Sequence, residues 1–255
     1  MREQRVSKII EYLNKNKVAS LDELCNKLRV SKNTIRRDVN ELIARGIADK
    51  VYGGILLSEK AGYANDNNTI SYINRFNESQ DAKRVIGELA ARLVEDEDTI
   101  FIDSGTTTPY ILPHLSDRRN LHIITNSLYV MNETKRHGID TYCLGGIYMP
   151  KTDSFVGGLS VLEDVRITKA FMGASLVDVS GMTNFSYHEA AMKKAIINRA
   201  EKIIVVTAAH KFGRTATICF CPLNLVSVIV SDTCPPKDFL DAATQEGVEL
   251  IYGKK

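Results

Sequence analysis

The amino-acid sequence predicts two domains: an N-terminal winged helix-turn-helix and a C-terminal α/β domain with a mainly parallel sheet. The first prediction rests on a helix-turn-helix pattern up to Gly46, with a Gly53-Gly54 hairpin signal directly after it. The second rests on the region from Asp81 onward, where helical stretches alternate with short apolar runs. That alternation is typical of parallel sheets covered by helices.

Length and composition indicate the class of protein. The chain has 255 residues, of which 44% are hydrophobic and 25% charged, as in one or two globular domains. No apolar run is long enough for a transmembrane helix, and residues 1–20 lack the apolar core of a signal peptide. We therefore expect a cytoplasmic protein without membrane contact. The five cysteines are scattered, and Cys219-x-Cys221 has no second ligand pair, so we expect neither a metal site nor a cofactor.

The charge is distributed unevenly along the chain. Residues 1–57 contain 12 Lys and Arg against 7 Asp and Glu, whereas the remainder contains 21 against 24. A basic N-terminal module on a slightly acidic body indicates that only the small part binds nucleic acid.

The first two helices follow from periodicity and capping. Residues 2–15 carry an apolar stripe at helical spacing, and Val18-Ala19 reads as a short extended link. Ser20-x-x-Glu23 is a capping box, which predicts the start of the second helix.

The third helix is the candidate recognition helix. Ser31 can cap it, and Ile35, Val39 and Leu42 form one apolar face. The opposite face is polar and cationic, as a helix in the major groove requires. The predicted DNA contacts on this helix and on the following hairpin, the wing, are Ser31, Asn33, Thr34, Arg36, Arg37, Asn40, Lys50 and Tyr52. For the helix taken alone, a solvent-exposed face with two arginines remains an alternative.

Asp38 lies nearer the apolar face, so we expect it to have an intramolecular partner. Residues 58–80 are rich in asparagine and lack a clear period, which predicts a linker or irregular connection. Arg75 stands out there, with a solvated arginine as the favoured interpretation.

The body, residues 81–255, carries polar loops at predicted strand ends. In open α/β sheets, ligands bind at the carboxyl ends of strands, and hydroxyls beside a glycine at a helix start favour phosphate. The candidate effector-binding residues are Asp103, Ser104, Gly105, Thr106, Thr107, Asn126, Gly145, Gly146, Lys193 and Lys211. We expect the loop of residues 104–107 and Lys211 to hold a phosphate, with Lys193 as a second cation. Asp103 and Asn126 are expected to bind sugar hydroxyls.

An enzyme remains the main alternative, because Asp103, Glu189, His188 and Lys211 could serve acid–base isomerisation of a sugar phosphate. The attached winged helix makes sensing the simpler explanation. A nucleic-acid scaffold without a ligand is a third class, but it leaves the polar strand ends unexplained.

Several motifs resemble those of the DeoR family of bacterial transcriptional repressors. In the first domain these are Leu21-x-x-Leu24, Val30-Ser31, Thr34 to Asp38 and Val51 to Gly54, with Tyr52 and Ile55 where the family usually has His and Ala. In the body they are Asp103 to Thr107, Thr125-Asn126-Ser127, Gly145-Gly146, Phe155-Val156-Gly157, Gly181-Met182-Thr183, Glu189 with Lys193, and Lys211-Phe212-Gly213. Residues 21–25, 30–40 and 50–54 are most similar to the family's repressors of inositol catabolism.

The resemblance implies that the body is similar in fold to ribose-phosphate isomerase and glucosamine-phosphate deaminase, and that it senses sugar-phosphate inducers. Ala208 departs from the family's usual Asp, so any orienting role of that Asp toward Lys211 must be met differently here. We expect a homo-oligomer, dimer or tetramer, because a single winged helix rarely binds operator DNA tightly.

Overall fold

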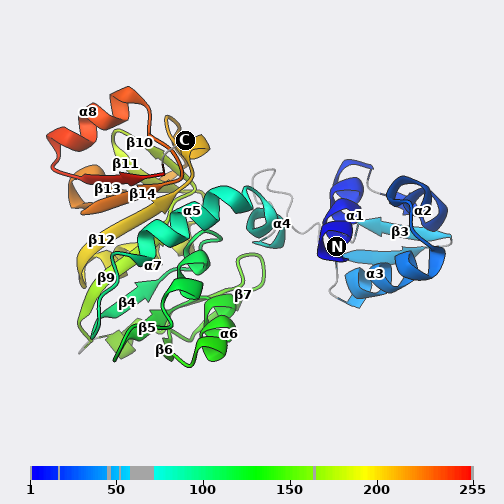
Figure 1. The fold of residues 1–255 in the computed structure, drawn as a ribbon, viewed down its shortest axis with the longest axis horizontal. Coiled ribbons are helices and arrows are strands. Elements are labelled where there is room, and N and C mark those ends of the chain that lie inside the picture. Colours follow the sequence, from blue (N-terminus) through cyan, green and yellow to red (C-terminus); the bar gives the residue numbers. More distant parts are fainter. Residues whose placement is uncertain are drawn as a thin grey trace. The chain divides into compact units, whose positions relative to one another are not determined.

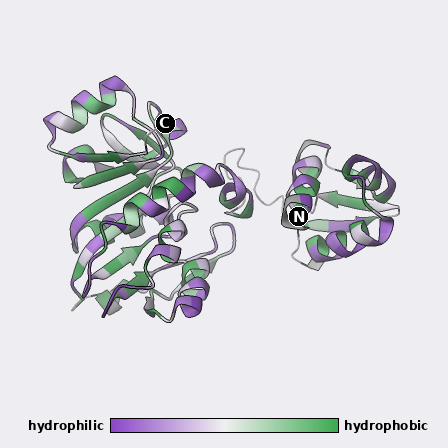
Figure 2. Ribbon diagram, viewed as in Figure 1, coloured by the Kyte–Doolittle hydropathy of each residue, from purple (hydrophilic) through white to green (hydrophobic). Residues whose placement is uncertain are grey.

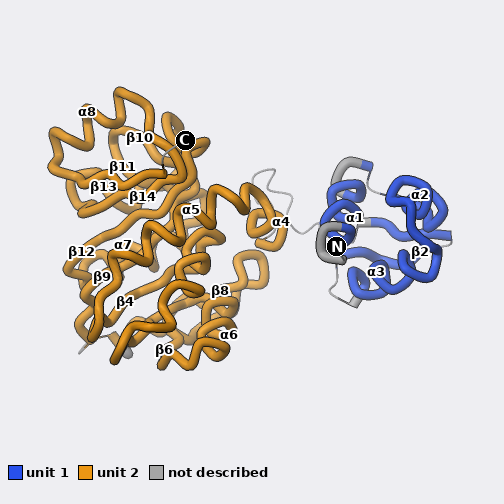
Figure 3. Tube along the Cα trace, in the orientation of Figure 1, with its two compact units in different colours: residues 1–70 blue, residues 71–255 orange. Residues whose placement is uncertain are grey.

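The computed structural model comprises two compact units, residues 1–70 and residues 71–255 (Figure 3). It describes residues 2–16, 18–44, 47–51, 53–57, 72–162 and 165–253. Within these ranges, no helix is both long enough and apolar enough to span a membrane.

The first unit is a winged helix-turn-helix (Figure 1). Its elements are α1 (Arg2–Asn16), β1 (Val18–Ser20), α2 (Leu21–Leu28), α3 (Lys32–Ala44), β2 (Ala48–Val51) and β3 (Gly54–Leu57). The strands pair antiparallel in the order β1-β3-β2, so the predicted extended link is the third strand of the wing. The predicted fold of this domain is confirmed, and Gly46 lies outside the described residues.

Local chemistry explains where α2 begins and ends. The hydroxyl of Ser20 accepts the N–H of Glu23, and the Glu23 carboxylate accepts the N–H of Ser20, which confirms the capping box. Arg29 ends the helix in a left-handed conformation, with φ of 52°. The predicted stripe of Ile35, Val39 and Leu42 is buried in the core of this unit.

The second unit is built on a parallel sheet of seven strands. Their order is β15 (Glu249–Tyr252), β14 (Val228–Ser231), β12 (Ala200–Thr207), β9 (Ile167–Gly173), β4 (Thr99–Ile102), β5 (His122–Thr125) and β6 (Asp140–Cys143). Each neighbouring pair is parallel, which confirms the predicted α/β class. The carboxyl ends of these strands therefore share one edge of the sheet.

Both faces of the sheet are covered. One face packs against α5 (Gln80–Ala91), the 3-10 helix η1 (Thr108–His114) and α6 (Leu128–His137). The other packs against α7 (Tyr187–Ile197), α8 (Lys237–Gln245) and a small sheet of β10 (Leu176–Asp178), β11 (Gly181–Asn184) and β13 (Ile218–Pro222). The strands between these layers are predominantly hydrophobic (Figure 2), as expected for a sheet buried on both faces.

Further short elements complete this unit. They are the hairpin β7 (Ile147–Met149) and β8 (Ser154–Val156), with the 3-10 helices η2 (Leu159–Leu162), η3 (Ala209–Lys211) and η4 (Leu223–Leu225). The hairpin and the small sheet have no separate signal in the amino-acid sequence, since their strands have only three to five residues.

The structure corrects the predicted linker over residues 58–80. Residues 72–77 form the helix α4 (Tyr72–Asn77) of the second unit, and α5 begins at Gln80. Six residues are too few to show a helical period, but Tyr72 and Phe76 are four residues apart and stack with ring centroids 6.0 Å apart. Residues 58–71 lie outside the described ranges.

The buried face of α5 differs from the face that its apolar residues indicate. Val85 is exposed, whereas Lys83, Ile86, Gly87 and Ala90 are buried. The apolar pattern does not identify the buried face of α5, because that face includes a lysine and a glycine, which are not apolar side chains.

Candidate functional site

The outer face of α3 is exposed as predicted. Asn33, Arg36, Arg37 and Asn40 are open to solvent, while the opposite face of the helix is in the core. Two guanidiniums and two amides on one open helix face are suited to contacts with phosphates and base edges.

Two residues predicted to contact DNA, Ser31 and Thr34, interact with each other at the start of α3. The hydroxyl of Ser31 accepts the N–H of Thr34 at 3.3 Å, and the two hydroxyls lie 2.9 Å apart. Ser31 is exposed and Thr34 half-buried, so both cap and shape the helix start.

Asp38 has the intramolecular role that was predicted. Its buried carboxylate accepts the guanidinium of Arg5, with Nε and Oδ2 2.5 Å apart. This ion pair joins α1 to α3 and raises the pKa of Arg5 above its ordinary value.

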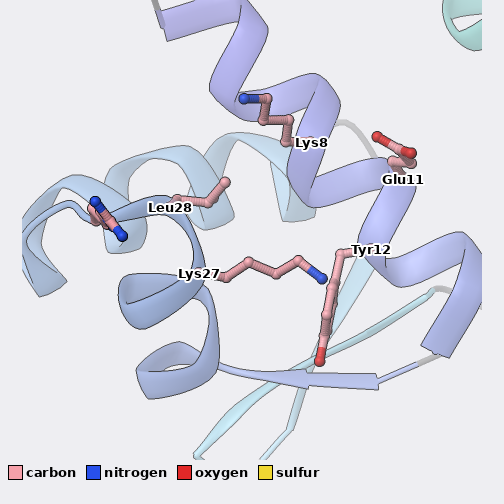
Figure 4. A pocket seen from close by; sticks show the side chains of 6 residues that line it. Lys8, Glu11, Tyr12, Lys27 and Leu28 are labelled. Atoms are coloured by element: carbon pink, nitrogen blue, oxygen red, sulfur yellow. The ribbon is translucent and has the colours of Figure 1, made fainter.

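On the wing, Lys50 is exposed and Tyr52 lies outside the described residues. An open hollow lies between α1 and α2, lined by Lys8, Glu11, Tyr12, Lys27, Leu28 and Arg29 (Figure 4). Lys27 and Tyr12 point toward one another there, with Nζ 4.4 Å from the ring centroid. This cation–π contact ties α2 to α1.

In the second unit, the predicted effector residues gather at the carboxyl edge of the sheet, here called the strand-end edge. Asp103 and its loop follow β4, Asn126 follows β5, and Lys211 lies beyond β12. Those that are buried are Asp103, Ser104, Thr106, Thr107, Asn126 and Lys193.

Asp103 is the centre of this edge. One carboxylate oxygen accepts the N–H of Gly105 and the hydroxyl of Thr108, each at 2.8 Å. The other accepts the N–H of Gly173 at 2.8 Å and lies 3.0 Å from the Lys193 ammonium. A Cβ on Gly105 would lie 2.9 Å from that carboxylate, which explains the glycine. The carboxylate thus has four protein partners, where the sequence suggested a sugar hydroxyl.

The expected helix N-terminus is also different. Residues 108–114 form a seven-residue 3-10 helix with a proline in its first turn, and Thr107 provides no side-chain cap. A short 3-10 helix has a weak dipole, and the N–H of Gly105 already donates to Asp103. The hydroxyls of Ser104, Thr106 and Thr107, rather than a helix end, are therefore the donors that this loop offers.

Of the two predicted glycines, only Gly146 is required by backbone packing. Gly146 has a φ of +119°, and a Cβ there would lie 2.3 Å from the carbonyl oxygen of Val156 in β8. Gly145 is exposed, and a Cβ at this position would have no neighbouring atom within 4 Å. The structure therefore explains Gly146 by the close approach of the β7–β8 hairpin.

Positive charge accumulates at the strand-end edge. The ammonium of Lys211 donates to the carbonyl of Ala174 at 3.0 Å. Burial lowers its pKa to about 8, with a further contribution from the charges of Arg75 and Lys193. Lys83 is buried and has its pKa lowered to about 8 by burial, then by Lys211 and Arg75. These groups therefore lie within electrostatic reach of one another.

Arg75 and Lys83 were missed as site residues. Arg75 is half-buried, which corrects the solvated interpretation. Lys83 donates to the carbonyl oxygens of Arg75 and Phe76 at the end of α4. The only sequence signal for Lys83 was a lysine among apolar residues at helical spacing.

Three buried polar atoms in the described part of the chain have no hydrogen-bond partner: the Tyr72 hydroxyl, Asn126 Oδ1 and the Thr207 hydroxyl. Asn126 Nδ2 donates to the carbonyl of Phe155 at 3.1 Å, which fixes its amide and leaves Oδ1 available. All three residues lie at or beside the strand-end edge, on α4, after β5 and at the end of β12. Unpaired buried oxygens are uncommon in proteins, and each requires a partner such as a water molecule or a ligand.

Of the four residues considered for isomerase chemistry, three are exposed or bound to other protein groups. His188 is exposed, and Glu189 accepts the Asn184 amide at 2.8 Å. The carboxylate of Asp103 accepts hydrogen bonds from Gly105 and Thr108 in its own loop. Among the described residues, no group of three or more His, Cys, Asp or Glu is placed to hold a metal ion.

A winged helix-turn-helix with an open arginine face, joined to a parallel α/β unit with a polar, cationic edge, defines a DNA-binding transcriptional regulator. Residues 5–61 match the DeoR-like helix-turn-helix domain, and residues 78–233 match the DeoR C terminal sensor domain. The chain belongs to the DeoR family, as its motifs predicted.

Related proteins support the same class over nearly the whole chain. The HTH-type transcriptional regulator IolR of Bacillus subtilis is 37% identical over 235 residues, 91% of each chain. The Escherichia coli glycerol-3-phosphate regulon repressor is 28% identical over 251 residues, 97% of each chain. A partial structural likeness, with a TM-score of 0.41 and 20% identity, is to a D-ribose-5-phosphate isomerase solved with phospho-erythronic acid. It covers 52% of this chain and 54% of that one.

We predict that Arg37→Ala weakens operator binding without unfolding the protein. Arg37 is exposed on α3, and loss of a guanidinium that reads a base pair costs on the order of 1–3 kcal/mol. Anisotropy titration of operator DNA measures the change, with circular dichroism to verify folding. Arg166→Ala, which removes a surface guanidinium from the second unit, is the control. Equal operator affinity for wild type and Arg37→Ala would exclude Arg37 as a DNA contact.

Proposed function

We propose that the protein represses a sugar or polyol catabolic operon and leaves its operator when a phosphorylated sugar binds at the strand-end edge. The observation that carries this proposal is the positive charge of Lys83 and Lys211, which lie within electrostatic reach of each other. Lys211 is also within reach of Asp103, directly before the hydroxyl-rich loop of residues 104–107. A relative over nearly the whole chain is a glycerol-3-phosphate regulon repressor, whose name includes a phosphorylated polyol.

The charges at this edge favour a dianion. Lys193 faces the carboxylate of Asp103, whereas Lys83 and Lys211 donate to main-chain carbonyls, which carry no net charge. Asp103 and Glu78 raise the pKa of Lys211 but do not offset its burial and its positive neighbours. A phosphate group would supply the missing negative charge and accept hydrogen bonds from Ser104, Thr106 and Thr107.

The neutral groups suit the rest of a sugar. Asn126 Oδ1 accepts a sugar hydroxyl, while Asp103 holds the phosphate loop in shape instead of binding the sugar directly. Lys193 supports the loop through Asp103. Gly145 and Gly146 then shape the rim at the end of β6.

Induction requires that the ligand bind one conformation of the second unit better than another. The operator-bound form has the lower effector affinity in this scheme, so effector binding shifts the protein toward a form that does not hold DNA. No bond is made or broken in the sugar, and the protein acts as a sensor rather than an enzyme. It works in the cytoplasm, where operator DNA is located.

The decisive experiment titrates operator-bound protein with phosphorylated and unphosphorylated forms of the same sugar. Operator DNA is first located by footprinting next to the gene. We expect only phosphorylated sugars to release the DNA and to stabilise the free protein against heat. The double variant Thr106→Val, Lys211→Ala should stay bound, while Lys202→Ala, an exposed lysine of β12, should respond like wild type. Equal release by both sugar forms, or sugar turnover, would contradict the proposal.

We also propose a homo-oligomer, at least a dimer. Two winged helices can then bind paired half-sites about 34 Å apart, or a multiple of that spacing. Light scattering at the concentration used for operator binding should give at least twice the mass of one chain. A single-chain mass together with full operator affinity would rule this out.

Effector affinity should fall as the pH rises through about 8. Lys83 and Lys211 have pKa values of about 8 in the folded protein and lose their charge there. We expect a loss on the order of tenfold by about pH 9, because an uncharged amine no longer attracts phosphate. Calorimetric titration across this range provides the measurement. Lys211→Arg should reduce the loss, since a guanidinium stays charged.

The stability of the ligand-free protein should change in the opposite direction. Both lysines have an ordinary pKa of 10.5, so between about 8 and 10.5 they bind more protons in the unfolded chain than in the folded one. Their contribution to the free energy of unfolding therefore rises with pH in this window.

An effector affinity that stayed constant between pH 7 and 9 would contradict a role for these ammonium groups in effector binding.

A further inference from the structure

Tyr72 occupies an unusual position at the start of α4. Its side chain is buried, and its ring packs against Phe76 and against Tyr129 of α6, with centroids 6.0 and 6.3 Å away. Phe76 in turn packs against Tyr110 of η1, with centroids 5.4 Å apart. This aromatic cluster fixes α4 on the second unit and holds the Tyr72 ring in one place.

The hydroxyl of Tyr72 has no hydrogen-bond partner within the described residues. An apolar ring alone would fill the same space without the cost of removing a hydroxyl from water, so packing explains phenylalanine better than tyrosine. Burial raises the pKa of Tyr72 well above its ordinary value, and Asp153, Tyr129 and Asp103 add to that rise. Arg75 acts in the opposite direction. The hydroxyl is therefore protonated and lies within electrostatic reach of Asp103 and Arg75, both at the strand-end edge.

A neutral phenol differs in chemistry from the cations nearby. It can donate one hydrogen bond and accept others, which suits a sugar hydroxyl or carbonyl oxygen. Lysines and arginine suit the phosphate. The amide oxygen of Asn126, also buried and unpartnered, is a second neutral group at this edge. Charged and neutral groups thus correspond to the two halves of a sugar phosphate.

We propose that the Tyr72 hydroxyl binds the sugar portion of the effector and makes α4 one wall of the effector site. The inference rests on the proposed function and adds a residue that selects among phosphorylated ligands. It also gives α4 a role in signalling. Lys83 holds the end of α4 through the carbonyls of Arg75 and Phe76, and Tyr72 begins the helix. A ligand on Tyr72 therefore acts on the start of α4.

The test compares Tyr72→Phe with wild type in the full-length protein. The probes are glucose 6-phosphate, fructose 6-phosphate, glycerol 3-phosphate and inorganic phosphate. Thermal melting gives the stability of the ligand-free protein, and calorimetry gives the affinity for each probe. We expect the ligand-free variant to melt at the same temperature or higher, because only an unpaired buried hydroxyl is removed. Its affinity for the best sugar or polyol phosphate should fall roughly 3- to 10-fold, with inorganic phosphate unaffected.

Tyr110→Phe is the matched control. Its ring belongs to the same aromatic cluster, but its hydroxyl already donates to the carbonyl of Phe76 at 3.5 Å. We expect this variant to melt slightly lower and to keep its ligand preference.

The outcomes separate the two proposals. If no phosphorylated probe stabilises wild type, the proposed function fails and the inference fails with it. If wild type binds a sugar phosphate and Tyr72→Phe binds it equally well, only the inference fails. A ligand-free Tyr72→Phe that melts well below wild type would also overturn it, because the hydroxyl would then have a structural partner.

Discussion

The carboxylate of Asp103 is the constraint on which the candidate site depends. It joins three segments far apart in the sequence: its own loop through Gly105 and Thr108, β9 through Gly173, and α7 through Lys193. A buried carboxylate is stable only when its charge is matched and its oxygens accept hydrogen bonds. Both conditions are met here within the protein. The loop of residues 104–107 therefore has a fixed shape before any ligand arrives, which reduces the entropy cost of binding.

This arrangement also separates structural charge from available charge. The ammonium of Lys193 balances the charge of Asp103 and so stabilises the loop of residues 104–107. Lys83 and Lys211 are held by carbonyl dipoles, and their depressed pKa values show that their charge is only partly compensated. A site that holds poorly compensated cations in a buried setting favours a dianion over a neutral sugar.

The sequence predicted most of the fold because the fold rests on local signals. The capping box at Ser20, the stripe of Ile35, Val39 and Leu42, and the seven apolar runs of the sheet each have a period or a spacing that backbone geometry dictates. Elements held by tertiary contact gave no such signal. The helix α4 is too short for a period and is held by rings from α6 and η1. The 3-10 geometry of residues 108–114 depends likewise on their packing against α5.

The candidate site was predicted as a set of positions but not as a set of roles. Strand ends placed Asp103, Asn126 and Lys211 at one edge, because the carboxyl ends of parallel strands must meet there. Their roles depend on partners distant in sequence, such as Gly173 for Asp103 and Phe155 for Asn126. Tyr72 and Arg75 were missed because they precede the first strand of the sheet, in a region read as a linker. Lys83 was missed because a lysine gives no signal for the buried face of the helix that follows.

The position of α4 suggests why a regulator would place part of its ligand site there. A ligand can shift an equilibrium only by the difference in its affinity for two states. Contacts to the rigid sheet alone contribute equally to both states unless the sheet itself changes. A contact to α4, which is held by aromatic packing and by the ammonium of Lys83 rather than by strand pairing, can differ between states at little cost to the core. In the proposed mechanism, effector contacts on α4 convert binding energy into differential affinity, whereas the Asp103 loop supplies affinity common to both states.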